Sequence, residues 1–598
     1  MNSPASDVAA LPLGVCVFSE TGPNRARTIS YANYAFEILD HAGVFHRKIA
    51  VNELEATLAE LRVLVTVGEA DLPESAKKKL TDWVKAGGAW LNVGGLCGLE
   101  SLLGVARLFS TYKNWGGGMR SLGEGYLFAP NTTADSKHPM LSHLNRPLHY
   151  FGGAAVEAKG ATVLATGQDA HGRPTGQPVI LENVVGKGRC IFIAVDVTGT
   201  VVHIQQGRGA ISRDGVPAPD GTSPVNDGVL KSDDGAVLDW LLDREPVAGA
   251  EGLSMFAQPI ADLWREILIR GIFHLALSTG ASLPVLWYWP RKLPAIGHLS
   301  HDTDGNEPAL GQRLLDTLKA GEVNSTWCVI LPGYSPELMA KIKAAGHEFA
   351  THYDAMTPGL PWSSAQFDRQ VKELTAMFGG EKPTTNKNHY LRWEGDSEIW
   401  DWCLKHGIGL DQTKGASKTG EAGYNFGTCH TYFPVRFDGS VIDVLELPTP
   451  TQDLVVFAPE AIFETLLAQS IKNHGVCHLL FHPAHFSRDE VAKAMLTVIR
   501  RGKEAGLEWW TGRQINAWER SRRKVSVTRY QSEGSRTLLT LESPDPLSEA
   551  TLLWFGSKAS ALDLAGQAST PLQAWGFTFQ AVSATLHETI TATAQARA

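Results

Sequence analysis

Residues 295–305 read AIGHLSHDTDG, an apolar strand pattern that runs directly into two aspartates. Later segments predict further strands, among them NSTWCVIL (324–331), GHEFATH (346–352) and VCHLLFH (476–482). Helical patterns separate these strands, and polar residues gather where the strands end. Successive βα units of this kind, between residues 294 and 520, predict a deformed (β/α) barrel whose functional site lies at the carboxyl ends of its strands.

The first hundred residues also alternate between strand and helix patterns. Short apolar runs at 14–19, 63–67 and 89–93 predict strands, and residues 31–42 and 76–86 have helical periodicity. Such alternation predicts an α/β fold with a flavodoxin-like parallel sheet covered by helices. Further strand-like runs extend to about residue 202.

This order of elements resembles the class I glutamine-amidotransferase-like (ThuA-like) domains, including those appended to some β-galactosidases. Glutaminase chemistry would need a cysteine nucleophile on a tight turn after a strand, with a histidine to activate it. The corresponding strand end, residues 65–70, reads VTVGEA and has no cysteine. Cys97, in GGLCGLE, is the nearby thiol, and we expect it to pack in the core. We therefore predict a catalytically silent domain.

Composition shifts divide the chain into three predicted domains. Residues 1–250 form the amidotransferase-like domain, which includes a long loop at 205–233 that is rich in Gly, Asp, Ser and Pro. Residues 251–522 form the barrel. Residues 523–598 alternate with a period of two and predict a small antiparallel β domain.

The overall composition excludes several classes of protein. The chain has 598 residues and a formal net charge of −9, so a nucleic-acid partner is not expected. Its 7 cysteines are scattered without a C-x-x-C pair, which disfavours a disulfide scaffold or a zinc finger. We find no secretory signal and no membrane-spanning pattern, and we expect a cytoplasmic protein with no membrane partner. A homo-oligomer is a further possibility, because the N-terminal domain could offer a surface for self-association.

Residues able to hold a metal ion gather at the predicted strand ends. Asp302 and Asp304 leave the first strand, and His352 and His389 follow later ones. One carboxylate and two neutral imidazoles leave an open position for water, as catalytic zinc and related divalent sites require. His482, at the end of the last clear strand, could protonate a leaving group.

At these residues the chain resembles the NodB-homology polysaccharide deacetylases, a family of carbohydrate esterases. SHDTDG (300–305) is similar to a divergent form of the leading motif, which implies that Asp302 is the general base and that Asp304 binds metal. GHEFATH matches the second motif and implies that His352 is a ligand. The family's partner histidine, four residues later, is replaced by Met356.

Two residues could fill the place of that missing histidine. Asp354 is close in sequence, but His389 keeps the Asp-His-His ligand set, and we favour it. The family's third motif has its nearest counterpart in Arg392 and Trp393, which we expect, with Asp354, to contact substrate, Trp393 as a wall of the cleft. The leucine-x-histidine final motif implies that His482 is the general acid.

The resemblance implies a divalent metal, with zinc as the first choice, and hydrolysis of an acetyl ester or amide on a carbohydrate. Two alternatives stay open. One is an allantoinase-like hydrolase that cleaves a C–N bond in a small non-sugar amide. The other is a catalytically inactive glycan-binding protein, which the methionine at position 356 favours.

Overall fold

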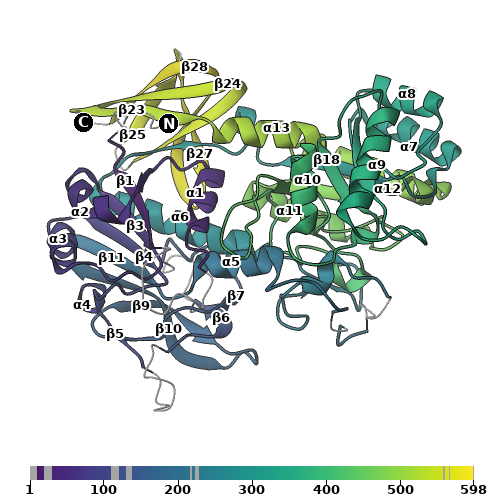
Figure 1. Ribbon diagram of the computed structural model, residues 1–598. Helices are drawn as coiled ribbons and strands as arrows, with labels where there is room; N and C mark the ends of the chain where they lie inside the picture. The colour runs from purple at the N-terminus through teal and green to yellow at the C-terminus, as the bar shows by residue number, and fades with distance from the viewer. Residues whose placement is uncertain are drawn as a thin grey trace. The chain divides into compact units, whose positions relative to one another are not determined.

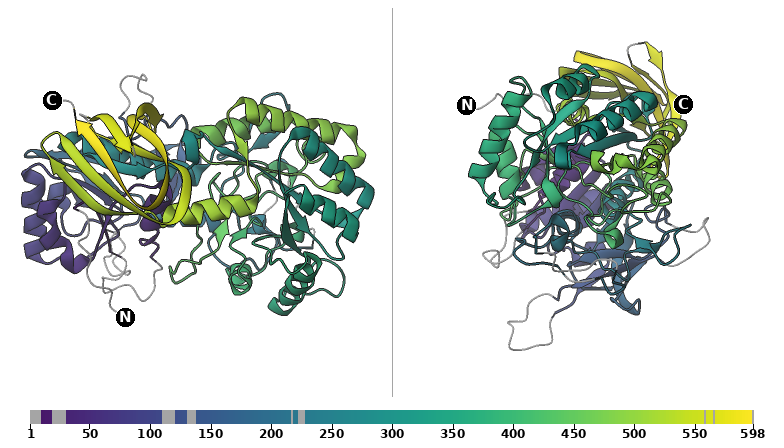
Figure 2. Two further views of the ribbon diagram at one scale, coloured as in Figure 1. Left: turned by 90° about the horizontal axis from the view of Figure 1, so that it is seen from above. Right: turned by 90° about the vertical axis from the view of Figure 1, so that its right-hand side faces the viewer.

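Figure 1 and Figure 2 show the computed structural model, which divides into two compact units. The first unit contains Met1–Val202, Leu263–Lys292 and Arg520–Ala598, and the second contains His203–Asp262 and Leu293–Glu519. Each unit is therefore built from stretches that are far apart in the sequence. The structure describes residues 10–18, 30–109, 120–129, 138–215, 218–221, 228–556, 559–564 and 566–596.

The first unit contains a mixed sheet that begins with parallel strands. β1 (Leu13–Val17) pairs in parallel with β2 (Arg47–Ile49) and β3 (Val63–Val67). Next come β4 (Ala89–Val93) and β11 (Gly188–Ile193), also in parallel. This confirms the predicted parallel sheet, whereas the likeness to amidotransferases stays a prediction. The remaining strands of the sheet are antiparallel: β10 (Pro174–Val185), β9 (Thr162–Gln168), β6 (Glu124–Phe128) and β7 (Leu148–Phe151).

Helix α3 (Glu74–Lys85) buries one apolar stripe. Its residues Ala76, Leu80 and Val84 recur every four positions and pack into a core with Trp90 of β4. The other elements of the first half of the chain are α1 (Tyr34–Ala42), α2 (Leu54–Thr57), α4 (Glu100–Leu103), β5 (Val105–Arg107), β8 (Val156–Ala158), α5 (Val197–Gln206), β12 (Glu245–Pro246), β13 (Ser254–Met255) and α6 (Ile260–Thr279).

The C-terminal residues form the predicted antiparallel sheet. Its two long strands, β24 (Arg536–Phe555) and β28 (Phe577–Ala596), pair along most of their length and are among the yellow strands of Figure 2. β14 (Leu283–Leu286), from the middle of the chain, pairs with β24. The sheet is therefore not made from residues 523–598 alone, since a buried apolar strand from elsewhere completes it. Its other strands are β23 (Ser526–Glu533), β25 (Ala559–Leu564), β26 (Gln567–Ala568) and β27 (Thr570–Ala574).

The second unit contains the predicted series of parallel strands. They follow the order β20-β19-β18-β17-β16-β15-β21, and β22 pairs with Ile296 and Gly297 of β15 on the edge opposite β21. The strands are β15 (Ile296–Asp302), β16 (Thr326–Val329), β17 (Glu348–Tyr353), β18 (Thr385–Asn388), β19 (Leu410–Asp411), β20 (Leu445–Glu446), β21 (Val476–Leu480) and β22 (Glu508–Trp509). The helices are α7 (Pro308–Gly321), α8 (Pro336–Ala344), α9 (Ser364–Met377), α10 (Glu398–His406), α11 (Ile462–Asn473), α12 (Asp489–Glu504) and α13 (Gly512–Arg523).

This sheet is a half-barrel. Within the residues that the structure describes, no continuous ladder joins β20 to β21. A single bridge, from Gln452 to Leu480, links the segment after β20 to β21. An irregular stretch therefore lies where a regular barrel would have another strand, and a closed barrel of NodB type stays a prediction.

The long loop predicted at 205–233 lies partly outside the described residues. Its described part makes two single bridges to the segment that follows β18, from Ile211 to Gly395 and from Lys231 to Arg392. The side chains of Lys231, Ser232 and Asp233 are buried. The segment Lys231–Asp233 of the loop is therefore packed against the half-barrel.

Two expectations from composition concern the chain as a whole. Of the helices in the described ranges, none combines the length and the apolar character that a membrane span needs. No disulfide joins the seven cysteines, all of which are described and buried. Burial raises the pKa of the Cys97 thiol to about 12, which agrees with a packing role.

Gly297 of β15 tests how tightly the strand that carries the aspartates is packed. A Cβ at this position would lie 2.6 Å from the Trp509 ring, so we expect Gly297→Ala to lower the free energy of unfolding by about 1–3 kcal/mol. Urea unfolding followed by tryptophan fluorescence measures the change. Gly209→Ala is the control, since a Cβ there meets nothing within 4 Å. Equal midpoints for the two variants would contradict the packing described here.

Candidate metal centre and its acid-base pair

Five polar side chains converge at the carboxyl ends of the parallel strands. Asp302 is the last residue of β15, and Asp304 opens the turn after it. His389 follows β18, and His482 follows β21. The sequence predicted that His352 follows a strand, but it lies inside β17. Because parallel strands end at the same edge of a sheet, residues far apart in sequence meet there.

Asp304, His352 and His389 form a group whose ligand atoms all lie within 4.8 Å of one another. Nε2 of His352 is 3.2 Å from Oδ1 of Asp304, and Nε2 of His389 is 3.4 Å from Oδ2. Burial opposes ionisation of Asp304, yet its contacts with the two histidines hold the pKa of this carboxyl well below its ordinary value. The group therefore offers one carboxylate and two imidazoles to a single ion.

The tautomer of His352 is fixed by the backbone. Its Nδ1 lies 2.9 Å from the carbonyl oxygen of Lys387, which can only accept a hydrogen bond, so Nδ1 carries the proton. The lone pair of Nε2 then faces Oδ1 of Asp304, and both atoms are buried without a hydrogen bond of acceptable geometry. Two lone pairs in contact repel each other unless a cation lies between them. These residues therefore fit a divalent metal ion.

His389 is oriented by Asp354. Nδ1 of His389 lies 3.1 Å from Oδ1 of Asp354, which also accepts a hydrogen bond of 2.8 Å from the backbone N–H of Met356. Burial alone would lower the pKa of His389, but Asp304 and Asp354 raise it to about 9. Asp354 thus touches the far side of the imidazole, and His389 is the residue that faces Asp304.

Asp302 and His482 form a second pair beside this group. Nε2 of His482 is 3.8 Å from Oδ2 of Asp302, and Nδ1 of the same ring is bound to Asp453. Asp453 also accepts a hydrogen bond of 2.7 Å from the backbone N–H of His482. Burial lowers the pKa of His482, but the charges of Asp453, Asp302 and Asp304 raise it to about 9. The ring can therefore donate a proton from Nε2.

Sequence reasoning missed two residues that contact the candidate site, Lys387 and Asp453. Lys387 is fully buried, and its Nζ lies 2.7 Å from Oγ of Ser300 and 3.7 Å from Oδ1 of Asp302. The sequence could have pointed to Lys387, because a charged residue in a predicted buried strand needs a partner. Asp453 lies in the irregular stretch between β20 and β21, where the sequence has no periodicity to place it.

Arg392 and Trp393, which we expected to contact substrate, have side chains that are engaged by other residues of the chain. Arg392 is paired with Glu394. Trp393 is only 1% exposed, and its ring stacks edge-on with Trp400. The exposed aromatic residue next to the metal group is Tyr390, which is 56% exposed and contacts the ring of His389.

No protein-family model matches this sequence. A comparison with curated proteins found no match either. Solved structures that are similar to part of the chain include a candidate polysaccharide deacetylase from Mycobacterium smegmatis, which is 19% identical over 40% of this chain and 94% of that one, with a TM-score of 0.31. A mutant of BA3943, a CE4 family pseudoenzyme with restored activity, is 15% identical over 38% of this chain and 69% of that one, with a TM-score of 0.25. The β-galactosidase of Bacillus circulans sp. alkalophilus is 12% identical over 32% of this chain and 30% of that one, with a TM-score of 0.23.

The buried position of Lys387 gives a test of the site's electrostatics. We expect Lys387→Met to lower the free energy of unfolding by about 3–5 kcal/mol, because Asp302 loses its buried cation. Lys405→Met is the matched control, since its ion pair with Asp368 is exposed and should be worth less than about 1 kcal/mol. Urea unfolding of both variants measures the difference, and similar losses in the two would refute the assignment.

Proposed function

We propose that this chain is a metal-dependent hydrolase that removes acetyl or related acyl groups from a carbohydrate. The observation that carries the proposal is the buried lone pair of His352 turned toward the carboxylate of Asp304. His389 adds a second imidazole to the same carboxylate. An acid-base pair, Asp302 and His482, lies beside this group.

Asp304, His352 and His389 would hold the ion. A divalent cation bound there would polarise an acyl carbonyl and lower the pKa of water. Asp302 supplies the base: its carboxylate is at the edge of the group, 3.8 Å from Nε2 of His352, and takes the proton from the attacking water. Lys387 faces the other carboxylate oxygen, with its Nζ 3.7 Å from Oδ1 of Asp302.

His482 supplies the acid. Its Nδ1–H is held by Asp453, so the proton on Nε2 points toward the Asp302 side of the site. As the C–N or C–O bond of the substrate breaks, Nε2 of His482 donates that proton to the departing amine or alkoxide. Asp453 orients the ring and stabilises its protonated form.

The carbohydrate part of the proposal rests on the resemblance of the sequence motifs to the NodB-homology deacetylases. The exposed ring of Tyr390 supports it, because an aromatic face beside the metal group can stack against the C–H face of a sugar ring. Trp393, buried against Trp400, offers no such face.

Metal content tests the ligand set directly. We expect His352→Gln to reduce the zinc bound per chain by one equivalent, because the imidazole that faces Asp304 is lost. Elemental analysis after dialysis against zinc at fixed concentration gives the stoichiometry. His171→Gln, an exposed histidine, is the control and should keep the wild-type content. Unchanged zinc in His352→Gln would remove the basis of the proposed function.

Acetate release tests the reaction. With zinc present, we expect the wild type to release acetate from oligomers of N-acetylated amino sugars or from O-acetylated sugars, and Asp302→Asn to be about 10²–10⁴-fold slower in kcat, since the base is lost. Asp316→Asn, on the exposed face of α7, should be as active as the wild type. Hydrolysis of cyclic ureides without acetate release would support the small-amide alternative, and sugar binding without any hydrolysis would support the glycan-binding one.

A further inference from the structure

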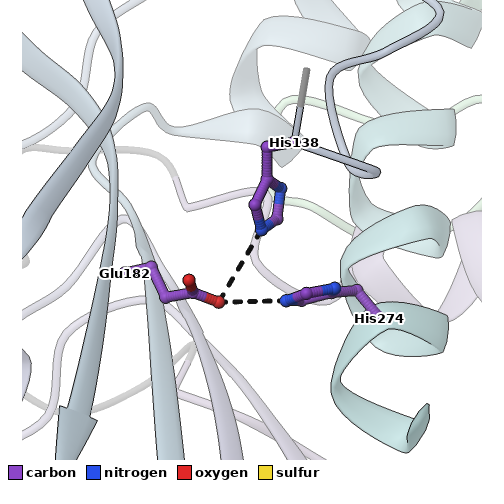
Figure 3. Close-up of side chains that lie close together, drawn as sticks. All are labelled: His138, Glu182 and His274. Atoms are coloured by element: carbon purple, nitrogen blue, oxygen red, sulfur yellow. Dashed lines mark hydrogen bonds and ion pairs between the residues drawn. The ribbon is translucent and has the colours of Figure 1, made fainter. Parts of the chain in front are cut away.

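A second cluster of metal-ligating side chains lies in the first unit, apart from the proposed hydrolytic site. Figure 3 shows His138, from the irregular segment after residue 137, Glu182 on β10 and His274 on α6. Their ligand atoms all lie within 4.8 Å of one another. The three residues are far apart in sequence, so the fold brings them together.

The two imidazoles point toward the same carboxylate oxygen. Nε2 of His274 is 3.0 Å from Oε1 of Glu182, and Nε2 of His138 is 3.7 Å from it. The two rings meet edge to face with their centroids 4.4 Å apart. Nε2 of His138 is buried and makes no hydrogen bond of acceptable geometry, although it points at the carboxylate.

An ion can reach the three side chains from solvent. The side chains of Glu182, His138 and His274 are 12%, 15% and 17% exposed, so they are largely buried but can be reached from solvent. Solvent access gives a metal ion a path to the group.

We propose that His138, Glu182 and His274 bind a divalent transition-metal ion, of which Zn²⁺ is the best match. Imidazole and carboxylate ligands suit zinc, and three protein ligands leave a fourth position for water. Zinc bonds of about 2.0–2.2 Å place neighbouring ligand atoms about 3.3 Å apart, so the separations of 3.0 and 3.7 Å need only small adjustments.

Three contacts must change when the ion binds. Each imidazole must present Nε2 as a lone pair and carry its proton on Nδ1. His274 therefore gives up the hydrogen bond of 3.0 Å between its Nε2 and Oε1 of Glu182, and His138 gives up the weak hydrogen bond of 3.3 Å that its Nδ1 accepts from Met140. Nη1 of Arg189, 2.7 Å from Oε1 of Glu182, competes with the ion for that oxygen. The Arg189 side chain is 31% exposed and can turn out into solvent.

The ion would stabilise the first unit by joining three segments. A ligand that binds only the folded state raises its stability in proportion to the logarithm of ligand concentration. The bound metal would tie α6, which comes from the middle of the chain, to the antiparallel half of the N-terminal sheet and to the segment at His138. We assign it a structural role.

The experiment uses the full-length chain in the His352→Gln background, which removes the proposed catalytic ion. We expect this variant to retain about one equivalent of zinc after dialysis, and Glu182→Gln or His138→Gln added to it to lose that equivalent. Added zinc should raise the melting temperature of His352→Gln but not that of the double variants. Arg189→Ala in the same background should bind zinc about fivefold more tightly, because the competing cation is gone.

His171→Gln in the same background is the control, and it should keep the zinc. If Glu182→Gln does not fold, His138→Gln decides, since it changes an irregular segment and no strand. The proposal is overturned if His352→Gln holds no zinc, or if the Glu182 and His138 variants keep as much zinc as their parent. Failure of the hydrolytic site gives a different pattern, in which wild type and His352→Gln bind equal amounts of zinc and Glu182→Gln loses it.

Discussion

The candidate site depends on the register between β17 and β18, in which His352 is opposite Lys387. This pairing puts the carbonyl oxygen of Lys387 against Nδ1 of His352 and so turns the lone pair of Nε2 toward Asp304. The same lysine sends its ammonium group to Ser300 and Asp302. A slip of one residue would move every side chain of the strand to the other face. One backbone pairing therefore positions both the metal group and the lysine beside the proposed base.

Much of this arrangement is predictable from sequence because it repeats a local pattern. Each apolar run that ends in a polar residue marks a parallel strand and its carboxyl end, so Asp302, Asp304, His389 and His482 could be placed at one edge of one sheet before the structure was known. The pattern fixes the end of a strand only to within a residue or two. His352 shows the effect, because it lies inside β17.

Residues whose role depends on tertiary contacts could not be placed in this way. Asp453 contacts His482 from an irregular stretch, which a single bridge joins to the sheet between Gln452 and Leu480. No periodic pattern in the sequence predicts that bridge. Trp393 has the aromatic side chain expected in the wall of a sugar-binding cleft, yet it is buried against Trp400. β14 completes a sheet whose other strands come more than two hundred residues later. In each case a contact distant in sequence decides what a local pattern leaves open.

The replacement of the expected histidine by Met356 has a structural consequence for the proposed metal centre. Position 356 lies beyond β17, and its backbone N–H helps to hold Asp354, whose carboxylate in turn orients His389. The second imidazole thus comes from the end of the neighbouring strand, β18, instead of from the same loop. A metal ion at this site would join three strands, β15, β17 and β18, where ligands from one loop would join two. Its geometry would then depend on the pairing of β17 with β18, which is also the pairing that fixes the tautomer of His352.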